Sequence, residues 1–170
     1  AIAAGGSHSL ALDRWGRLRA WGFSAGGRTL VPDLKKVVAI AAGDSHSMAL
    51  QHDGTVVVWG SNDAGQREVP QGLSGVVDIA AAGSEHCLAL KADGTVVAWG
   101  ANGDGQATVP AGLAGVVGIS AGAFHSMALK SDGTVVAWGR NADGQATPPV
   151  DLGGVAQIAA GYWHSLALAG

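Results

Sequence analysis

Apolar and polar residues alternate with a period of two along much of this chain, in blocks that recur along its length. In one block, residues 86–90 (His-Cys-Leu-Ala-Leu) alternate, Asp93-Gly94 follows, and residues 95–100 (Thr-Val-Val-Ala-Trp-Gly) are rich in β-branched side chains. Such alternation predicts half-buried strands, and Asp-Gly between two of them predicts a hairpin. A preceding strand is predicted over residues 76–81 (Val-Val-Asp-Ile-Ala-Ala). Each block therefore predicts three short strands.

The blocks are tandem repeats. A histidine recurs at His8, His46, His86, His125 and His164, and a Trp-Gly pair at Trp21, Trp59, Trp99 and Trp138, with spacings of 38, 40 and 39 residues. A period of this length predicts a solenoid or a propeller. The units run over residues 1–36, 37–75, 76–115 and 116–154, with a partial unit at 155–170. Four units predict all three strands and the last predicts two, so we expect fourteen strands in one array that is open at one end.

The second strand of each unit indicates how the units pack. His46, Met48 and Leu50 are large and share one face, whereas Ser47 and Ala49 are small and share the other. This complementarity suits a sheet whose bulky face stacks on the small face of the next sheet. The sequence predicts an all-β fold, a β-propeller or open propeller arc of about five short blades of three to four strands, the last incomplete. A β-solenoid is the alternative, although its coils are usually shorter.

Composition narrows the functional classes. The 170 residues are 48% hydrophobic and 14% charged, as expected of a folded domain, and the net charge of −3 comes without a basic cluster, so we expect no nucleic-acid partner. No run of 18 apolar residues occurs, and the first residues lack a charged n-region, so we expect no membrane span and no intact signal peptide. Charge is unevenly spread: residues 1–40 carry +4 and the remainder −7.

Residues that could carry chemistry are assigned structural roles. The repeated histidines lie on strands predicted to pack between blades, so we interpret them as hydrogen-bonded core residues and predict no metal site. Asp53, Asp93 and Asp132 precede glycine in hairpin turns, where a short carboxylate bonds its own backbone. No nucleophile elbow, P-loop or CxxC motif occurs. We predict no catalytic residues, no cofactor and no enzymatic activity.

The loops remain as candidate binding elements. In a three-stranded antiparallel unit, the loop between the first two strands and the end of the third strand emerge at one edge of the blade. Residues at these positions vary between otherwise uniform repeats, which is where binding specificity can reside. Phe124, Tyr162 and Trp163 are large rings and a predicted hot spot; the alternative is that these loops are simply unconstrained. The predicted partner-binding residues are Phe23, Asp44, Ser45, Asp63, Ser84, Glu85, Asp104, Phe124, Asp143, Tyr162 and Trp163.

The repeated motif GxxHSLALKxDGTVVAWGxNxxGQxxVP resembles the repeat of the regulator-of-chromosome-condensation superfamily of β-propellers, over essentially the whole chain. These short repeats leave no room for the β-wedge of its eukaryotic exchange factor, and they look closer to bacterial members that include a propeller inhibitor of β-lactamase. The resemblance implies a binding module with a protein partner, possible inhibition of a bacterial enzyme, and a secreted or periplasmic location. The chain has too few repeats for seven blades, and fewer loop aromatics than that inhibitor.

Other functions stay open on the sequence alone. The chain could be an accessory or carbohydrate-binding propeller domain of a larger protein, or a duplicated or designed scaffold without a ligand. The open end of the array predicts self-association, or closure by missing repeats, because an unpaired strand edge invites pairing. The opposite charges of the first unit and the remainder favour a head-to-tail contact.

Overall fold

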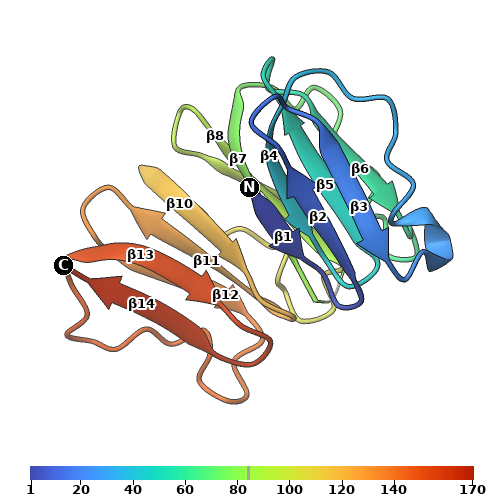
Figure 1. Ribbon diagram of the computed structural model, residues 1–170. Helices are drawn as coiled ribbons and strands as arrows, with labels where there is room; N and C mark the ends of the chain where they lie inside the picture. Colours follow the sequence, from blue (N-terminus) through green and yellow to red (C-terminus); the bar gives the residue numbers. More distant parts are fainter. Residues whose placement is uncertain (84) are drawn as a thin grey trace.

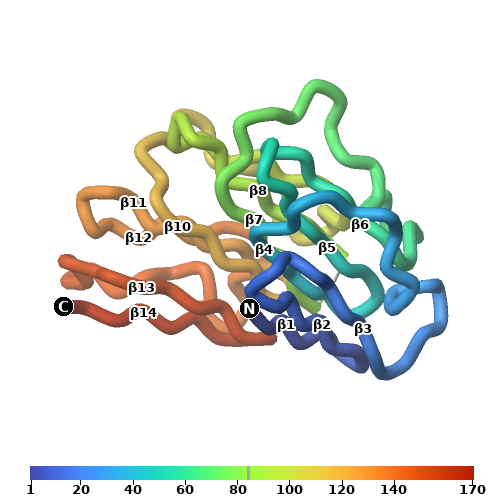
Figure 2. The backbone as a smooth tube through the Cα atoms, turned by 45° about the horizontal axis from the view of Figure 1, so that its top comes forward, coloured from blue at the N-terminus to red at the C-terminus, as the bar shows by residue number. Residues whose placement is uncertain are grey.

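The computed structural model describes residues 1–83 and 85–170 and consists of five small antiparallel sheets arranged as an open arc (Figures 1 and 2). The strands are β1 (Ile2–Ala4), β2 (His8–Leu12), β3 (Leu18–Gly22), β4 (Val37–Ala42), β5 (His46–Gln51), β6 (Val56–Gly60), β7 (Val76–Ala82), β8 (His86–Lys91), β9 (Val96–Gly100), β10 (Val116–Ala121), β11 (His125–Lys130), β12 (Val135–Gly139), β13 (Val155–Ala160) and β14 (Ser165–Ala169). One short 3₁₀ helix, η1 (Ala25–Gly27), follows β3.

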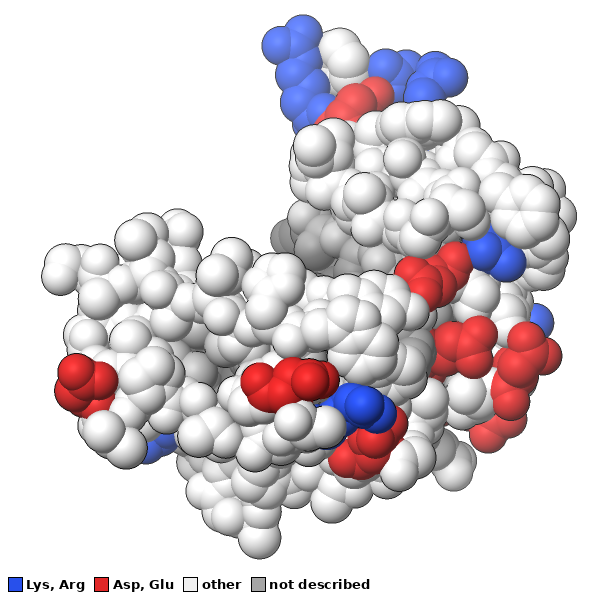
Figure 3. Space-filling model, turned by 90° about the horizontal axis from the view of Figure 1, so that it is seen from below, with Lys and Arg blue, Asp and Glu red and all other residues white. Residues whose placement is uncertain are grey.

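The predicted fold class is confirmed. Four sheets hold three strands each in chain order, β1-β2-β3 through β10-β11-β12, and the fifth holds only β13 and β14. The first strand of each blade lines a central cavity of about 520 Å³, whose walls are mainly alanine and glycine. The two ends of the arc do not close on each other, and a space-filling view shows the hollow between them (Figure 3). No helix in the described residues is long and apolar enough to cross a membrane.

Neighbouring blades are joined by a repeated side-chain contact, which we call the inter-blade contact. The Nε2 atom of each of the first four repeated histidines contacts the small residue after the next histidine: His8 with Ser47 at 2.8 Å, His86 with Ser126 at 3.0 Å and His125 with Ser165 at 3.0 Å. His46 meets the Cys87 sulfur at 3.3 Å. The bulky face of one second strand therefore lies on the small face of the next, as the alternation predicts.

The serine of this contact fixes the protonation of its histidine. The hydroxyls of Ser47, Ser126 and Ser165 donate to backbone carbonyls of the preceding linker, at 2.9, 2.8 and 2.6 Å. Because the hydroxyl proton is used there, the histidine Nε2 atom must donate to the serine oxygen. Burial lowers the pKa of His46 to about 4, with the neighbouring His86 and His8 adding to the effect. Burial also lowers the pKa of His8 and His125, so these three rings are neutral in the folded protein, and the Nε2 atoms of His8 and His125 donate to their serines.

A buried tryptophan lies in each interface between two three-stranded blades. Trp59 Nε1 donates to the carbonyl of Arg28, Trp99 to that of Gln66 and Trp138 to that of Gln106, each at 2.9 Å. The three indoles are only 6–7% exposed. The third strands β6, β9 and β12 thus each carry a ring that holds the preceding linker against the blade, which explains why Trp-Gly recurs with the histidine.

A glycine is required beside the imidazole in every unit except the third. A Cβ atom at Gly43 would lie 2.6 Å from His46 Nδ1, and one at Gly122 would lie 2.5 Å from His125 Nδ1. No real side chain tolerates such contacts, so the residue three positions before the histidine must lack a Cβ. The third unit differs because its first strand is one residue longer: β7 extends to Ala82, and Gly83 beyond it lies against Tyr162 and Ala123 instead of the imidazole.

The first strand of each later blade contains a β-bulge that simple alternation does not reveal. The register shifts just after Val37, Val76, Val116 and Val155. These four valines are buried, at 4–6% exposure, whereas the next valines, Val38, Val77 and Val117, are 50–58% exposed. The bulge turns the second valine of each pair toward solvent.

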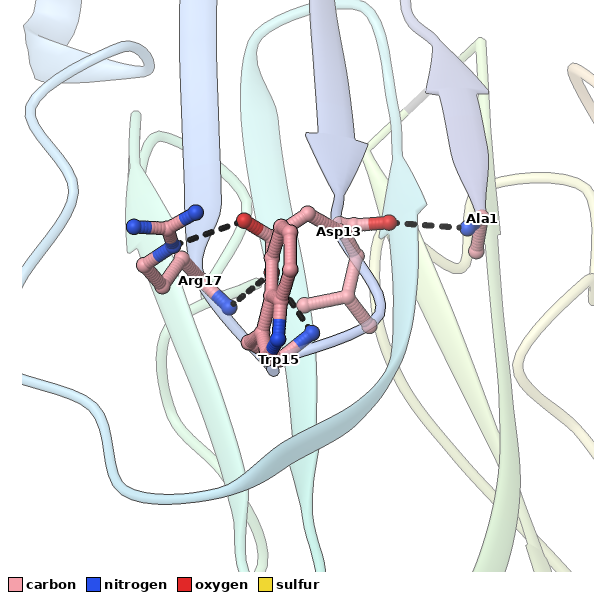
Figure 4. A network of polar contacts seen from close by, with 5 residues as sticks. Ala1, Asp13, Trp15 and Arg17 are labelled. Atoms are coloured by element: carbon pink, nitrogen blue, oxygen red, sulfur yellow. Dashed lines mark hydrogen bonds and ion pairs between the residues drawn. The ribbon is translucent and has the colours of Figure 1, made fainter.

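The hairpin of the first blade keeps its shape with different residues. The Asp13 carboxylate accepts hydrogen bonds from the Trp15 and Arg17 backbone nitrogens at 2.8 and 3.0 Å, and Arg17 Nε donates to it at 2.7 Å (Figure 4). In later hairpins the aspartate stands two positions further on and accepts from a threonine backbone nitrogen, as in Asp53 with Thr55 at 2.9 Å. A carboxylate therefore stabilises the turn in both arrangements.

Candidate protein-binding face

The loops between the first and second strands lie beside the ends of the third strands, which confirms the predicted edge. Backbone nitrogens just past the third strands donate to carbonyls in these loops: Phe23 to Ser7 at 2.8 Å, Ser61 to Ser45 at 3.0 Å, Ala101 to Glu85 at 3.0 Å and Arg140 to Phe124 at 2.8 Å. We call the surface formed by these two sets of loops the loop face. The hairpin turns between the second and third strands lie at the opposite edge of the four three-stranded blades.

Three rings gather on the loop face between the last two blades. Phe124 and Trp163 stack with centroids 5.0 Å apart and planes 27° apart, and Tyr162 contacts both, at 6.2 Å from Phe124 and 5.2 Å from Trp163. Tyr162 and Trp163 are 49% and 44% exposed. They meet because Phe124 and Trp163 occupy the same position, just before the histidine, in adjacent repeats.

Arg140 completes this group, which we call the aromatic patch: Phe124, Arg140, Tyr162 and Trp163. The Arg140 guanidinium lies 5.1 Å from the Trp163 ring centroid and 6.0 Å from that of Phe124. Its Nη1 atom is 3.9 Å from Asp104 Oδ1, which brings that predicted residue to the edge of the patch. Arg140 is not among the residues predicted from the sequence; the available signal was that Ser61 and Ala101 occupy its place in the preceding repeats.

A second group of predicted residues lies on the loops of the first three blades. Ser45 Oγ donates to Glu85 Oε1 at 2.6 Å, and Arg28 Nη1 donates to the Asp44 carbonyl at 2.7 Å. The Arg28 guanidinium also lies 5.3 Å from the centroid of the exposed Phe23 ring. Arg28, which stands where later linkers have glutamine, therefore connects these loops.

Tyr162 links the two groups across the centre of the arc. Burial, and then the nearby Glu85 charge, raise the pKa of the Asp44 carboxyl, while a hydrogen bond with Tyr162 and the Arg28 charge act in the opposite direction. The Tyr162 ring also lies against Gly83, where a Cβ atom would be 3.0 Å from the ring. The last blade thus reaches the loops of the second and third blades.

Two predicted residues with described positions, Asp63 and Asp143, do not join these groups. Asp63 accepts a 2.6 Å hydrogen bond from Ser61 in its own loop, and the Asp143 backbone nitrogen donates to Gln145 Oε1 at 2.9 Å. Both carboxylates are exposed and serve as loop residues. Ser84 lies outside the described residues.

Among the described residues, no group of three or more His, Cys, Asp or Glu could hold a metal ion. The central cavity is lined by small residues, with Asp44 as the one charge among its described lining residues. Figure 3 shows the largest gathering of basic side chains at one end of the arc, around an acidic one, and mainly acidic side chains with a few basic ones over the rest of that view.

The comparisons identify the repeat and the fold. Residues 37–66, 76–106 and 116–145 match the family described as Regulator of chromosome condensation (RCC1) repeat, more than half of the chain. Comparison with curated protein sequences gave no match.

Solved structures of similar fold are longer than this chain. They include Prp20p from Saccharomyces cerevisiae, studied with its binding to Gsp1p and histones (TM-score 0.82, 21% identity, 98% of this chain and 55% of that one). Yeast RCC1 (Prp20) bound to Kap60 gives a TM-score of 0.82 at 20% identity, covering 98% and 53%. Human WBSCR16 gives 0.80 at 21% identity, covering 98% and 58%. The chain therefore spans little more than half the length of these structures.

Proposed function

The chain belongs to the Regulator of chromosome condensation (RCC1) repeat family, and from this premise we propose that it is a non-enzymatic module that binds a partner protein through the loop face. The aromatic patch is the observation that carries the proposal. Exposed aromatic rings beside an arginine are the residue types most enriched at interface hot spots.

The patch is organised for binding before any partner arrives. Phe124 and Trp163 already stack, and the backbone of Arg140 is tied to Phe124 by a 2.8 Å hydrogen bond. Because the side chains are held by one another, a partner has to immobilise fewer of them, and association costs less conformational entropy.

The structural relatives support protein binding as the class of function. Prp20p was studied with its binding to Gsp1p and histones, and yeast RCC1 was solved with Kap60. These partners belong to those proteins, and their identities are not carried over. The narrower proposal, inhibition of a bacterial enzyme, rests on the similarity of the short repeats to a propeller inhibitor.

Capture experiments with matched variants test the proposal. The full chain and two variants, Trp163→Ala and Phe124→Ala, are immobilised and exposed to a bacterial extract, and retained proteins are identified by mass spectrometry. Trp15→Ala is the control, because Trp15 is 65% exposed but lies in a hairpin turn at the opposite edge. We expect a protein retained by wild type and Trp15→Ala and lost from both patch variants.

The affinity of that protein is then measured in purified form. Unchanged affinity in both patch variants would refute recognition through the patch. Binding on a glycan array that the patch variants abolish would favour the carbohydrate-binding alternative, and the absence of any protein or glycan ligand would favour the scaffold.

Self-association is a second proposal, carried by the bare faces at the two ends of the arc. Leu166 and Leu168 of β14 are each 59% exposed, whereas their counterparts one repeat earlier, Met127 and Leu129, are 2% and 7% exposed. At the other end, Trp21 on β3 is 54% exposed. The last sheet thus exposes the bulky face of its second strand, and the first sheet exposes the small face. These are the two faces that pack against each other between neighbouring blades.

A further inference from the structure

Lys36 has a backbone conformation that belongs to glycine in the later repeats. Its φ angle is 47°, in the left-handed region, and it immediately precedes strand β4. The residues at this position in the next three units are glycines with φ angles of 67°, 69° and 63°: Gly75, Gly115 and Gly154. A residue with a Cβ atom is disfavoured in this region, so the backbone at Lys36 is strained where that of the glycines is not.

Contacts within the fold do not explain this lysine. The carbonyl at this position accepts a hydrogen bond from the adjacent hairpin whether or not a side chain is present: from His52 to Lys36 at 3.0 Å, from Ala92 to Gly75 at 2.8 Å and from Ser131 to Gly115 at 2.9 Å. The Lys36 side chain is exposed, and its ammonium group forms no ion pair with any described residue. A strained residue that the turn does not need points to a functional role for its side chain.

The preceding residue, Lys35, is also exposed, and its backbone is held against the second blade. Gln51 stands where the next two hairpins have lysine, and its Oε1 atom accepts from the Lys35 backbone nitrogen at 2.6 Å. The two lysines line a surface depression together with His52 and Asp53. The Asp53 carboxylate accepts from the Thr55 backbone nitrogen of its own turn at 2.9 Å. The lysine pair is therefore held in place by the neighbouring hairpin.

The first hairpin adds two arginines beside the lysines. A Cβ atom at Gly16 would lie 3.5 Å from the Val37 carbonyl oxygen, so this hairpin lies against the residue that follows Lys36. It carries the exposed Arg14 and Arg17, where the third and fourth units have only small uncharged residues. The acid of this hairpin, Asp13, is engaged by Arg17 Nε at 2.7 Å and by two backbone nitrogens (Figure 4).

We call these four residues the basic edge: Arg14, Arg17, Lys35 and Lys36. Arg17 is paired with Asp13, whereas the other three form no ion pair within the described part of the chain. Exposed cations without internal partners are complementary to a surface that is rich in carboxylates.

We propose that the basic edge binds a short carboxylate-rich segment of a partner protein. Residues 41–170 carry a net charge of −7, so a long polyanion extending beyond the basic edge would be repelled, whereas a short acidic segment would not. The hairpin turns lie at the edge opposite the loop face, so this binding does not depend on the aromatic patch or on the function proposed for it.

A fluorescein-labelled hexaglutamate peptide provides the probe. It is titrated with the full chain, and binding is followed by fluorescence anisotropy at low and at high salt. We expect saturable binding that weakens as salt increases, because salt screens exposed charges. A hexaserine peptide of the same length should not bind.

Lys36→Gly separates binding from stability. The substitution removes one cation and gives residue 36 the glycine of the later units. Peptide affinity should fall about twofold to fivefold, whereas the Tm should be unchanged or higher because the backbone strain is relieved. The double variant Lys35→Ser, Lys36→Gly copies Ser74-Gly75 of the next unit and should lose about tenfold in affinity.

Arg67→Ala is the matched control. Arg67 is exposed in the loop that follows β6, so the variant loses the same charge as Lys36→Gly but keeps the basic edge intact. It should bind the peptide with full affinity. Arg14→Ala should weaken binding to the same degree as Lys36→Gly, which tests the first hairpin separately.

Several results would overturn the proposal. These are no binding at low salt, an equal loss of affinity in Arg67→Ala and Lys36→Gly, or a Lys36→Gly chain that melts at a lower temperature and binds the peptide fully. Tighter binding of an oligothymidylate of equal charge, or of vesicles containing phosphatidylserine, would assign the basic edge to nucleic acid or to a membrane surface instead. A dimer that Lys36→Gly dissociates would assign it to a second copy of the chain.

Discussion

The indole of Trp163 stacks on the ring of Phe124 at a centroid distance of 5.0 Å, although the two residues belong to different blades. The contact therefore joins the incomplete last sheet to the rest of the arc on the loop face. It also couples the two rings energetically, so that the effect on stability of removing one ring depends on whether the other is present.

This coupling is measurable without a partner. In urea unfolding, the losses in stability caused by Phe124→Ala and Trp163→Ala should be non-additive in the double variant by about 0.5–1.5 kcal/mol, as for other aromatic pairs. The pair Phe124→Ala and Trp15→Ala should be additive, because those rings lie at opposite edges. Additivity in both pairs would show that the stacked rings do not support each other.

Stability should fall as the solution is acidified from pH 6.5 to about 4. The pKa of His46 is lowered to about 4 by burial and by neighbouring histidines, and burial also lowers the pKa of His8 and His125. Between pH 6.5 and about 4 these histidines bind protons in the unfolded chain but remain neutral in the folded chain, so acidification favours unfolding. For His46 alone the loss reaches about 3 kcal/mol.

Urea unfolding at a series of pH values checks this expectation. His46→Gln should be less stable at neutral pH but should show a shallower pH dependence, because one group that titrates on unfolding is gone. An identical slope in wild type and variant would mean that His46 has the same pKa in the folded and the unfolded chain.

Cys87 should be unreactive in the folded protein. Its side chain is 0% exposed, its sulfur lies 3.3 Å from His46 Nε2, and burial raises the pKa of the thiol. The thiolate is the reactive form, so a thiol reagent should label the chain only after unfolding. Rapid labelling of one thiol per native chain would contradict the packed position of Cys87.

The proposed self-association should depend on concentration and salt. Mass measured by light scattering should rise with protein concentration, and less so at high salt, because residues 1–40 carry +4 and the remainder −7. Leu166→Asp should reduce the association by placing a charge on the bare face of β14. Val117→Asp is the control, since Val117 is 58% exposed at a bulge away from the ends. A monomer at every concentration and salt would exclude the proposal.

Most of the fold could be predicted from the sequence because the repeat displays each local signal several times. Alternation of large and small residues, such as His46 and Ser47, predicted which faces of the strands pack against each other. The number of strands in each repeat predicted that the last sheet has two strands. The bulges after Val37 and its counterparts were not predicted, because a Val-Val pair has the same appearance in a regular strand.

The candidate site was predicted less completely. Ring positions before the histidines identified Phe124 and Trp163, but Arg140 and Arg28 were missed because their contacts span blades and depend on how the sheets are placed around the arc. For the same reason, Asp63 and Asp143 could not be separated from Asp104 by sequence position alone.

The histidine and serine of the inter-blade contact give the array a polarity. Each blade has a hydrogen-bond donor on one face and an acceptor on the other, so every interface between blades joins two different faces. A whole repeat can therefore be added or removed, and each remaining interface still joins the same pair of faces. Duplication of complete units therefore needs no compensating change elsewhere in the core. A chain built in this way can vary its length in evolution while its loops diverge one repeat at a time.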